Sequence, residues 1–258
     1  MLCNLKPYKS PGPDSLHAYV LKACADCLAK PLCILYKQSL TAGHIPNDWK
    51  CANITPVFKK GCKSKPSNYR PISLTSQVAK ILESIVRDTM QDYLTKHNVI
   101  NCHQHGFREG KSCFTNLLET FEDWNRAVDE KKGIDVIYLD FKKVFDSVPH
   151  KRLLCKLQGY GITGKLLNWI QEFLHHRLQR VIVGGYASNW CQVKSGVPQG
   201  SLLRPLLFII YINDVPEIID CNIQQYADDT KLYSVISCYN DSTRFQQDLD
   251  QVANWSMK

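Results

Sequence analysis

Apolar residues recur at helical spacing along much of the chain. Behind Ser76, a residue type that caps helices well, apolar side chains return every three or four positions as far as Leu94, which predicts a long amphipathic helix. The same spacing predicts shorter helices near residues 16–43, 117–132, 166–174, 206–211 and 245–252. Within the first of these we expect Pro31 to break or kink the helix and Gly43 to end it.

Short apolar runs bounded by turn residues predict strands. Residues 54–58 lead into a basic loop, and residues 181–186 carry the Gly-Gly pair of a hairpin turn. Residues 136–139 resemble a buried strand that ends at Asp140. A carboxylate there would carry a desolvation cost unless it were paired or bound to a metal, so Asp140 is a better functional candidate than an average aspartate.

Two adjacent carboxylates, Asp228 and Asp229, lie between two segments rich in strand-favouring residues. This pattern predicts that the pair lies at the tip of a β-hairpin. Two carboxylates this close repel each other unless one is protonated or a cation neutralises them. Mg²⁺ suits such a pair because it takes hard oxygen ligands and leaves positions for substrate phosphates. The alternative is that both aspartates are ordinary turn residues.

Composition and charge narrow the class of protein. The chain has 258 residues, of which 44% are apolar and 22% charged, as in a globular protein with an ample core. Its formal net charge of +8 favours a polyanionic partner, although ordinary soluble proteins also carry such an excess. Twelve scattered cysteines indicate reduced thiols. We find no signal peptide and no apolar run of membrane-spanning length, so we expect the cytoplasm and nucleus and no membrane partner.

Basic side chains are concentrated between residues 50 and 70, where there are six of them and no acidic residue. Because phosphate contacts supply most nonspecific nucleic-acid affinity, a loop of this kind could grip a triphosphate or a nucleic-acid backbone. A plain solvated loop explains the same residues equally well.

Six blocks of the sequence together resemble the reverse transcriptase of non-LTR (LINE) retrotransposons, most closely that of jockey-type elements. They occur in the family's order over nearly the whole chain: Ser10–Asp14, Asn68–Leu74, Gln104–Arg108, Asp140–Asp146, Gly196–Ser201 with Pro205–Phe208 and Tyr211–Asp214, and Tyr226–Asp229. One such block is weakly specific, whereas six in order are strongly specific.

The resemblance implies an α+β fold, a right-hand polymerase with fingers and palm. Its palm would be a small antiparallel sheet backed by helices, and the thumb would be absent. By the same likeness residues 1–130 form an N-terminal extension and the fingers, and residues 131–258 form the palm with finger-like insertions. We expect the chain to be truncated at both ends relative to the full element protein, stopping in the palm block that follows the hairpin of Asp228.

The implied activity is that of an RNA-directed DNA polymerase, which adds deoxynucleoside triphosphates to the 3′-hydroxyl of a DNA primer on an RNA template. By resemblance Asp140, Asp228 and Asp229 hold two Mg²⁺ ions, with Mn²⁺ as a substitute, for a two-metal nucleotidyl transfer. The fragment could instead be a truncated or domesticated remnant that binds nucleic acid without polymerising. A viral RNA-dependent RNA polymerase is a more distant alternative, since those enzymes usually carry a Gly-Asp-Asp block and lack an aromatic gate.

The resemblance also assigns residues around the incoming nucleotide. They are the triphosphate contacts Lys59, Lys60 and Arg70, the steric gate Phe145, the pocket residues Gln199 and Gly200, and the template contact Arg108. Each has a structural explanation as well: Phe145 could be plain core, Arg70 an ion-pair partner and Gln199 a turn residue. Two positions depart from the family pattern, with Val144 where a small alanine is usual and Arg204 where glycine is usual.

Overall fold

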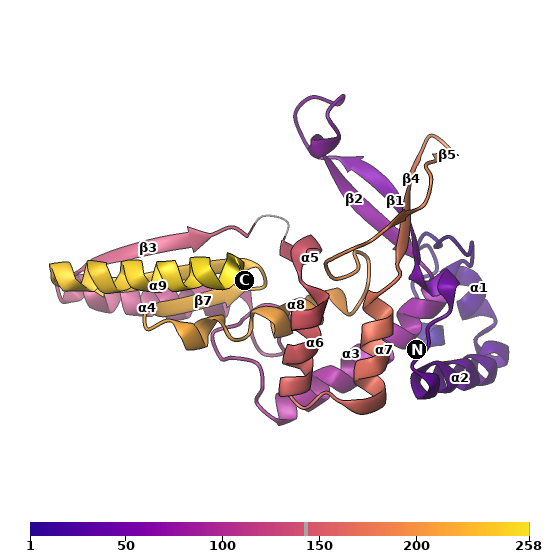
Figure 1. Ribbon diagram of the computed structural model, residues 1–258, viewed down its shortest axis with the longest axis horizontal. Coiled ribbons are helices and arrows are strands. Elements are labelled where there is room, and N and C mark those ends of the chain that lie inside the picture. Colours follow the sequence, from indigo (N-terminus) through magenta and orange to yellow (C-terminus); the bar gives the residue numbers. More distant parts are fainter. Residues whose placement is uncertain (142–143, 258) are drawn as a thin grey trace. The chain divides into compact units, whose positions relative to one another are not determined.

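The computed structural model describes residues 1–141 and 144–257, so Lys142 and Lys143 of the Asp140–Asp146 block and the terminal Lys258 lie outside the description. The chain divides into two compact units, each made of two separate segments. The first unit comprises residues 1–91 and 145–204, and the second comprises residues 92–144 and 205–258. Helices and strands alternate in both, which confirms the predicted α+β class (Figure 1).

The first unit is built on a five-stranded sheet in the order β2-β1-β4-β5, with β6 also paired to β4. The strands are β1 (Cys51–Phe58), β2 (Tyr69–Thr75), β4 (Leu178–Val183), β5 (Tyr186–Ala187) and β6 (Cys191–Gln192). β1 and β2 form an antiparallel hairpin, whereas β4, which arrives from the second segment of the unit, runs parallel to β1. The turn between β4 and β5 has Gly184 and Gly185 at positive φ, which confirms the predicted hairpin.

Helices account for most of the rest of the first unit. They are η1 (Leu2–Asn4), α1 (Ala18–Ala23), α2 (Ala25–Ala42), η2 (Asn47–Lys50), η3 (Pro66–Asn68), α3 (Gln77–Lys96), α5 (Val144–Ser147), α6 (His150–Gly159) and α7 (Gly164–Leu174). α3 continues into the second unit, and α5 begins on the last residue of that unit. The apolar faces of α6 and α7 supply much of the core through Leu153, Leu157 and Trp169.

Pro31 was expected to break or kink its helix, and the expected break was wrong. α2 runs through Pro31, and the preceding helix, α1, ends at Ala23. Proline removes one backbone donor, which leaves the carbonyl of Cys27 without its helical partner. Cys27 is exposed, so water can satisfy that carbonyl and the helix tolerates the proline. Gly43 ends α2 at φ 64, as predicted, because glycine reaches the left-handed region without strain.

The first block of the sequence lies against the junction of β2 and α3. A Cβ atom on Gly12 would come within 2.5 Å of the Ser76 nitrogen, so only glycine fits there without a shift. The Gln77 side chain donates to the carbonyl of Ser10 at 2.9 Å. Ser76 itself accepts a hydrogen bond from the Ala79 amide at 3.3 Å, which confirms its predicted role as a helix cap.

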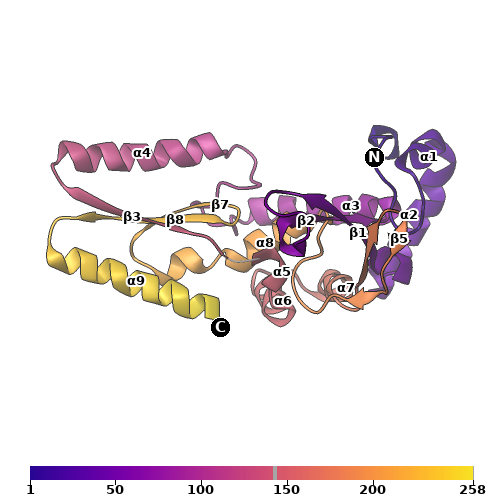
Figure 2. The same ribbon diagram turned by 90° about the horizontal axis from the view of Figure 1, so that it is seen from above.

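The second unit is built on a three-stranded antiparallel sheet in the order β3-β8-β7. Its strands are β3 (Gly133–Leu139), β7 (Asn222–Tyr226) and β8 (Asp229–Ile236). Its helices are α4 (Cys113–Asp129), α8 (Arg204–Ile212), η4 (Val215–Ile218) and α9 (Tyr239–Met257), of which α8 begins on the last residue of the first unit. α4 and α9 lie on opposite faces of this sheet (Figure 2).

α4 meets the sheet through polar as well as apolar side chains. Its buried residues are Asn116, Thr120 and Ala127, and Trp124 packs edge-on against Tyr233 of β8. The two polar residues pair with Lys231 of β8, whose buried ammonium donates to Thr120 Oγ1 at 2.6 Å and to Asn116 Oδ1 at 3.4 Å. Burial lowers the pKa of Lys231, and these oxygens replace the water that the ammonium has lost.

The expectation that residues 136–139 form a buried strand was also wrong. β3 forms as predicted, but it is an edge strand, and Tyr138 is 72% exposed. An edge strand is covered less well by the flanking helices than the central β8. Asp140 is likewise exposed, so the desolvation cost that singled it out does not apply.

Two further expectations concern thiols and membranes. All twelve cysteines are free, in agreement with the prediction of reduced thiols. Within residues 1–141 and 144–257, no helix combines the length and apolarity needed to cross a membrane.

Candidate functional site

The two adjacent carboxylates lie at the tip of a tight hairpin, as the sequence predicts. Tyr226 of β7 pairs with Asp229 of β8, which leaves Ala227 and Asp228 as a two-residue turn. Ala227 has φ 57, the conformation that short hairpin turns demand and that a residue with a side chain adopts at a cost. Asp228 is half-buried and Asp229 is exposed.

The third predicted carboxylate reaches the same end of the sheet through strand register. The β3–β8 ladder ends with Leu139 opposite Thr230, so Asp140 and Asp229 are the next residues on the two strands. Residues opposite each other in an antiparallel pair have Cβ atoms about 4.5–5.5 Å apart. Asp140, which lies 88 positions before Asp228 in the sequence, thus comes to the end of the sheet that carries the hairpin turn, because β3 pairs with β8.

These donors suit a divalent cation. No group of three His, Cys, Asp or Glu side chains within the described part of the chain is already arranged as a metal cage. Mg²⁺ does not require such a cage, because it commonly binds through one or two carboxylates together with water and substrate phosphates. Asp140 and Asp229 across the sheet end, with Asp228 beside them, offer the hard oxygen ligands that such an ion prefers.

The turn is held in place by the loop that contains Gln104–Arg108, in which the sequence analysis gave a role only to Arg108. Gln104 is 1% exposed, and its side-chain oxygen accepts hydrogen bonds from the amides of Ala227 at 2.9 Å and Gly106 at 2.8 Å. Gly106 lies so close that a Cβ atom on it would come within 2.3 Å of the Ala227 nitrogen. Gln104 and Gly106 therefore fix the backbone between Tyr226 and Asp229, and a glycine within a polar block was the only hint of this in the sequence.

The same loop is docked along β7. The His105 amide donates to the Gln225 carbonyl at 2.8 Å, and the Gln225 amide donates to the His103 carbonyl at 3.0 Å. Arg108 donates to the carbonyls of Asn101 at 2.7 Å and Gln104 at 3.3 Å. In this structure Arg108 thus closes its own loop, and its contact with a template stays a prediction.

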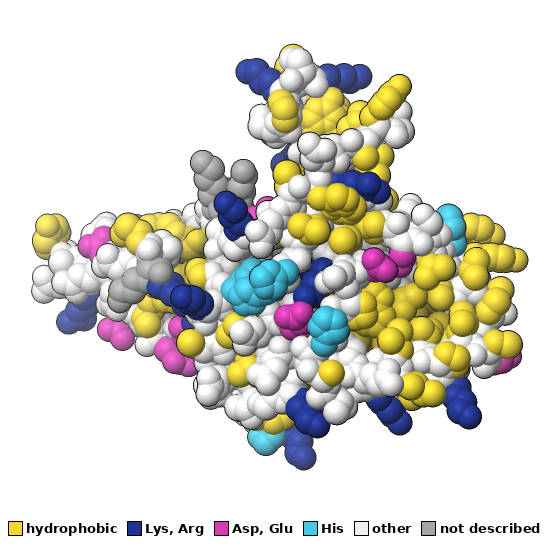
Figure 3. All heavy atoms as spheres, turned by 45° about the vertical axis from the view of Figure 1, so that its right-hand side comes forward, with side chains coloured by type: hydrophobic (Ala, Val, Ile, Leu, Met, Phe, Trp, Pro, Cys, Tyr) yellow, Lys and Arg dark blue, Asp and Glu magenta, His cyan; other side chains and the backbone are white. Residues whose placement is uncertain are grey.

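The predicted triphosphate residues belong to the first unit, on the β1–β2 hairpin. Lys59 and Lys60 are exposed in the loop that follows β1, and Arg70 is exposed on β2 opposite Val57. The loop is ordered by the Lys59 amide, which donates to the Asn68 carbonyl at 2.9 Å. Figure 3 shows Lys and Arg side chains standing out at the tip of the hairpin, a surface that suits a polyanion.

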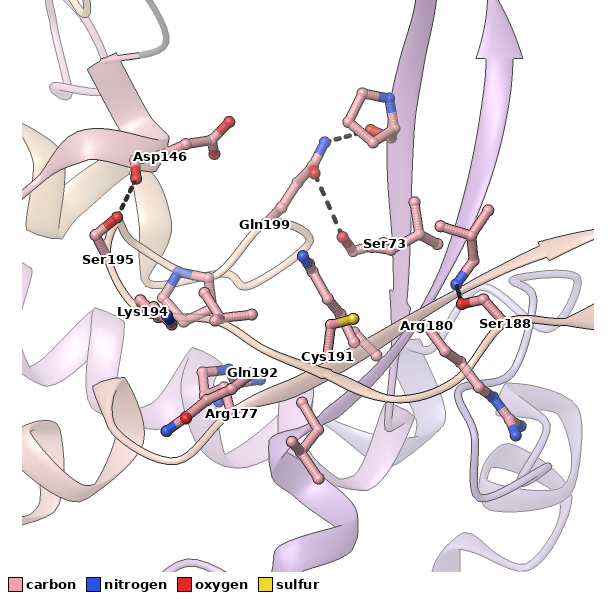
Figure 4. A pocket seen from close by; sticks show the side chains of 18 of the residues that line it. Ser73, Asp146, Arg177, Arg180, Ser188, Cys191, Gln192, Lys194, Ser195 and Gln199 are labelled. Carbon is pink, nitrogen blue, oxygen red and sulfur yellow. Dashed lines mark hydrogen bonds between the residues drawn. The ribbon is translucent and has the colours of Figure 1, made fainter. Parts of the chain in front are cut away.

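Gln199 lines a cavity of about 550 Å³ in the first unit and lies against β2 there (Figure 4). The Gln199 side chain accepts from the Ser73 hydroxyl at 3.4 Å and donates to the carbonyl of Pro71. Gly200 has φ 78, and a Cβ atom on it would come within 2.5 Å of the Ser73 carbonyl oxygen. The basic side chains Arg180 and Lys194 line the same cavity, which gives it a positive wall.

Phe145 is held by the segment that precedes Gln199. Its carbonyl accepts from the Val197 amide at 2.8 Å, and the Ser195 hydroxyl donates to the neighbouring carbonyl of Asp146 at 2.9 Å. Gly196 allows this close approach, because a Cβ atom on it would come within 2.6 Å of the Asp146 Cα. The predicted gate and the predicted pocket residues thus share one rigid substructure of the first unit.

His150 adds a further support to that substructure. Its Nε2 atom lies 2.8 Å from the Gly196 carbonyl oxygen, so the neutral ring donates to it. Burial lowers the pKa of His150, which keeps the ring neutral near pH 7. The sequence offered no signal for this role.

The comparisons of this chain with a family profile and with individual proteins agree with one another. The profile of a family described as "Reverse transcriptase (RNA-dependent DNA polymerase)" matches residues 57–258. The chain is 30% identical over 96% of its length to "Probable RNA-directed DNA polymerase from transposon BS" of Drosophila melanogaster, of which it covers 28%. It is 28% identical over 99% of its length to "RNA-directed DNA polymerase from mobile element jockey" of the same species, of which it covers 29%. The chain therefore spans less than a third of these relatives.

Proposed function

Because this chain belongs to the reverse transcriptase (RNA-dependent DNA polymerase) family, we propose that it is the part of a non-LTR retrotransposon protein that copies RNA into DNA. The single observation that supports the proposal is the register of β3 with β8, whose last pair, Leu139 and Thr230, adjoins Asp140 and the Asp228–Asp229 turn. Three carboxylates at one end of a small antiparallel sheet are what a nucleotidyl transfer with divalent ions needs.

We assign the palm to the second unit and the fingers to the first. The three-stranded sheet with α8 and α9 supports the first assignment, and the basic β1–β2 hairpin supports the second. Each unit combines two segments of the chain. The division into fingers over residues 1–130 and palm over residues 131–258 stays a prediction.

In the proposed reaction the primer 3′-oxygen attacks the α-phosphorus of a deoxynucleoside triphosphate and loses its proton to solvent. The bond between the α-phosphorus and the bridging oxygen breaks, and pyrophosphate leaves. Reverse transcriptases generally use divalent metal ions, and we propose two Mg²⁺ ions, which when bound would stabilise the attacking and leaving oxygens. Asp140, Asp228 and Asp229 would hold them. Gln104 and Gly106 would keep the carboxylate turn from moving, because they fix the Ala227 amide.

The remaining candidate residues would select and orient the nucleotide. Lys59, Lys60 and Arg70 would neutralise the triphosphate. The ring of Phe145 would occupy the space of a sugar 2′-hydroxyl and so favour deoxynucleotides.

Residues of two other blocks would complete the site. Gln199 and Gly200 would line the nucleotide pocket, which the cavity beside them supports. Arg108 would contact the template strand. RNA, a DNA primer and deoxynucleoside triphosphates are therefore the proposed partners.

Primer extension on an RNA template with Mg²⁺ and deoxynucleotides tests the proposal. We expect Asp140→Asn and Asp228→Asn each to lower the rate of primer extension by at least about 100-fold. Removing one stabiliser of transition-state charge has effects of this size. Asp135→Asn, at an exposed aspartate of the same β3 strand, should extend as well as the unchanged chain. Extension that survives Asp228→Asn would contradict the proposal, and so would salt-sensitive RNA binding without any extension by the unchanged chain.

A further inference from the structure

Arg204, the residue that departs from the family pattern, contacts the predicted steric gate. Its guanidinium carbon lies 4.7 Å from the centroid of the Phe145 ring, in the geometry of a cation–π interaction. Both residues belong to the first unit, Phe145 in α5 and Arg204 at the first position of α8.

The same guanidinium is anchored on two other groups. It donates to the Val197 carbonyl at 3.2 Å and forms an ion pair with the Asp146 carboxylate at 3.2 Å. The Arg204 side chain is only 18% exposed, whereas that of Asp146 is 57% exposed. The ion pair alone is therefore weak because water screens it, but three simultaneous contacts fix the plane of the guanidinium over the ring.

The backbone of Phe145 is fixed independently of its ring. The Val197 amide holds the Phe145 carbonyl at 2.8 Å, and Gly196 packs directly against Asp146. The position of the Cα atom is thus determined by the Ser195–Val197 segment. What the guanidinium adds is a restraint on the rotation of the ring itself.

We propose that Arg204 is a positioning residue that holds the Phe145 ring and thereby sets how strictly the site selects deoxyribonucleotides over ribonucleotides. A steric gate rejects a 2′-hydroxyl only as strongly as the ring resists displacement. A ring with a cation over its face is more costly to displace than the same ring without that cation. This inference rests on the proposed function, because it assigns the gate to Phe145.

The first test measures the efficiencies of single-nucleotide incorporation of dATP and ATP opposite uridine in an RNA template. We expect Arg204→Ala to raise the relative use of ATP about three- to tenfold, the factor that one partly desolvated cation–π contact supplies. The relative use of ATP by Arg204→Lys should lie between those of the unchanged chain and Arg204→Ala, because lysine keeps the charge and loses the planar stack. Arg87→Ala removes an arginine that is paired with Asp88 on α3, and it should leave the ratio unchanged.

The effect must also depend on Phe145. We expect Phe145→Ala alone to raise the relative use of ATP strongly, and Arg204→Ala to add nothing once Phe145→Ala is present. A ratio that Arg204→Ala leaves unchanged while Phe145→Ala alters it would overturn the inference. An equal effect of Arg204→Ala with and without the ring would overturn it as well.

A second readout separates this inference from the proposed function. If the unchanged chain extends no primer, the proposed function fails, but the contact itself can still be measured by thermal melting. We expect Arg204→Ala to lower the melting temperature by about 2–4 °C, as about 1 kcal/mol does in a protein of this size. The shift should shrink in the Phe145→Ala background, and an undiminished shift would show that Arg204 does not hold the ring.

Discussion

Leu139 and Thr230 are the last pair of the β3–β8 ladder, so the residues that adjoin them, Asp140 and Asp229, lie at the same end of the sheet. Both side chains are exposed, and Asp228 lies in the adjoining turn. Carboxylates brought to one end of a sheet repel one another unless a cation neutralises them. We therefore expect this end of the sheet to attract a divalent ion.

Metal binding should therefore stabilise the chain, and it should do so through Asp140. We expect saturating Mg²⁺ to raise the melting temperature by about 3–5 °C relative to EDTA, since a tenfold excess over the dissociation constant contributes about 1.4 kcal/mol. Asp140→Asn should melt slightly higher than the unchanged chain in EDTA and gain little from Mg²⁺. Asp135→Asn in the same strand is the control, and an equal Mg²⁺ shift in all three proteins would contradict the prediction.

Gln104 should matter for activity beyond its effect on stability. Gln104→Met leaves the buried amides of Ala227 and Gly106 without their acceptor, which we expect to cost about 2–3 kcal/mol of unfolding free energy. Because the Ala227 amide lies in the carboxylate turn, kcat of primer extension should fall more than tenfold. Urea unfolding and extension kinetics measure the two effects.

A matched control is available in the first unit. Gln77 is also buried and binds one backbone group, the carbonyl of Ser10. Gln77→Met should lower the unfolding free energy and leave kcat almost unchanged. Equal losses of kcat in the two variants would show that Gln104 acts only through general stability.

The sequence predicted local features, such as turns and helix ends, better than it predicted how each element is buried in the fold. The Asp228 hairpin was predictable because strand-favouring residues flank a pair of turn formers, and the end of α2 was predictable from Gly43. The burial of β3 was not, since a short apolar run does not say whether its strand lies at the centre or the edge of a sheet. Pro31 misled for a similar reason, because its effect depends on whether the freed carbonyl meets water.

The residues of the candidate site likewise include some that could be predicted from the sequence and some that could not. Residues with distinctive chemistry, such as Asp140 and Phe145, were identified through blocks that resemble a family. Gln104 and His150 escaped because their roles are hydrogen bonds to backbone atoms more than 40 residues away, at Ala227 and Gly196. Arg204 was noticed only as a departure, and its contact with the Phe145 ring could not be read from sequence spacing.

Gly200 should not tolerate a side chain. Gly200→Ala would bring Cβ to within 2.5 Å of the Ser73 oxygen at φ 78, so we expect a loss of about 2–3 kcal/mol from strain and displacement. Since Gln199 is the preceding residue, KM for the deoxynucleotide should rise several-fold. Gly185→Ala has similar backbone strain at φ 85 with nothing within 4 Å, so it isolates the cost of conformation. A KM that rises equally in both variants would contradict a specific role for Gly200.

His105 should make the stability of the chain fall in mild acid. The ring is fully buried, with Nδ1 2.8 Å from Thr115 Oγ1 and Nε2 3.2 Å from Glu119 Oε2. Burial lowers the pKa of His105, and the cations Lys111 and Arg108 lower it further, although Glu119 opposes them. The unfolded chain therefore takes up a proton near pH 6.5 that the folded chain does not yet accept, so stability is lost as the pH falls below that value.

Urea unfolding between pH 5 and 8 checks this expectation. His105→Gln should be less stable than the unchanged chain at pH 8 but should show a weaker decline toward pH 5. Some decline should persist in that variant, because burial lowers the pKa of His150 in the same direction. His97→Gln, at an exposed histidine of the same unit, should keep the full decline. If His105→Gln and the unchanged chain decline in parallel, protonation of His105 is not what weakens the fold.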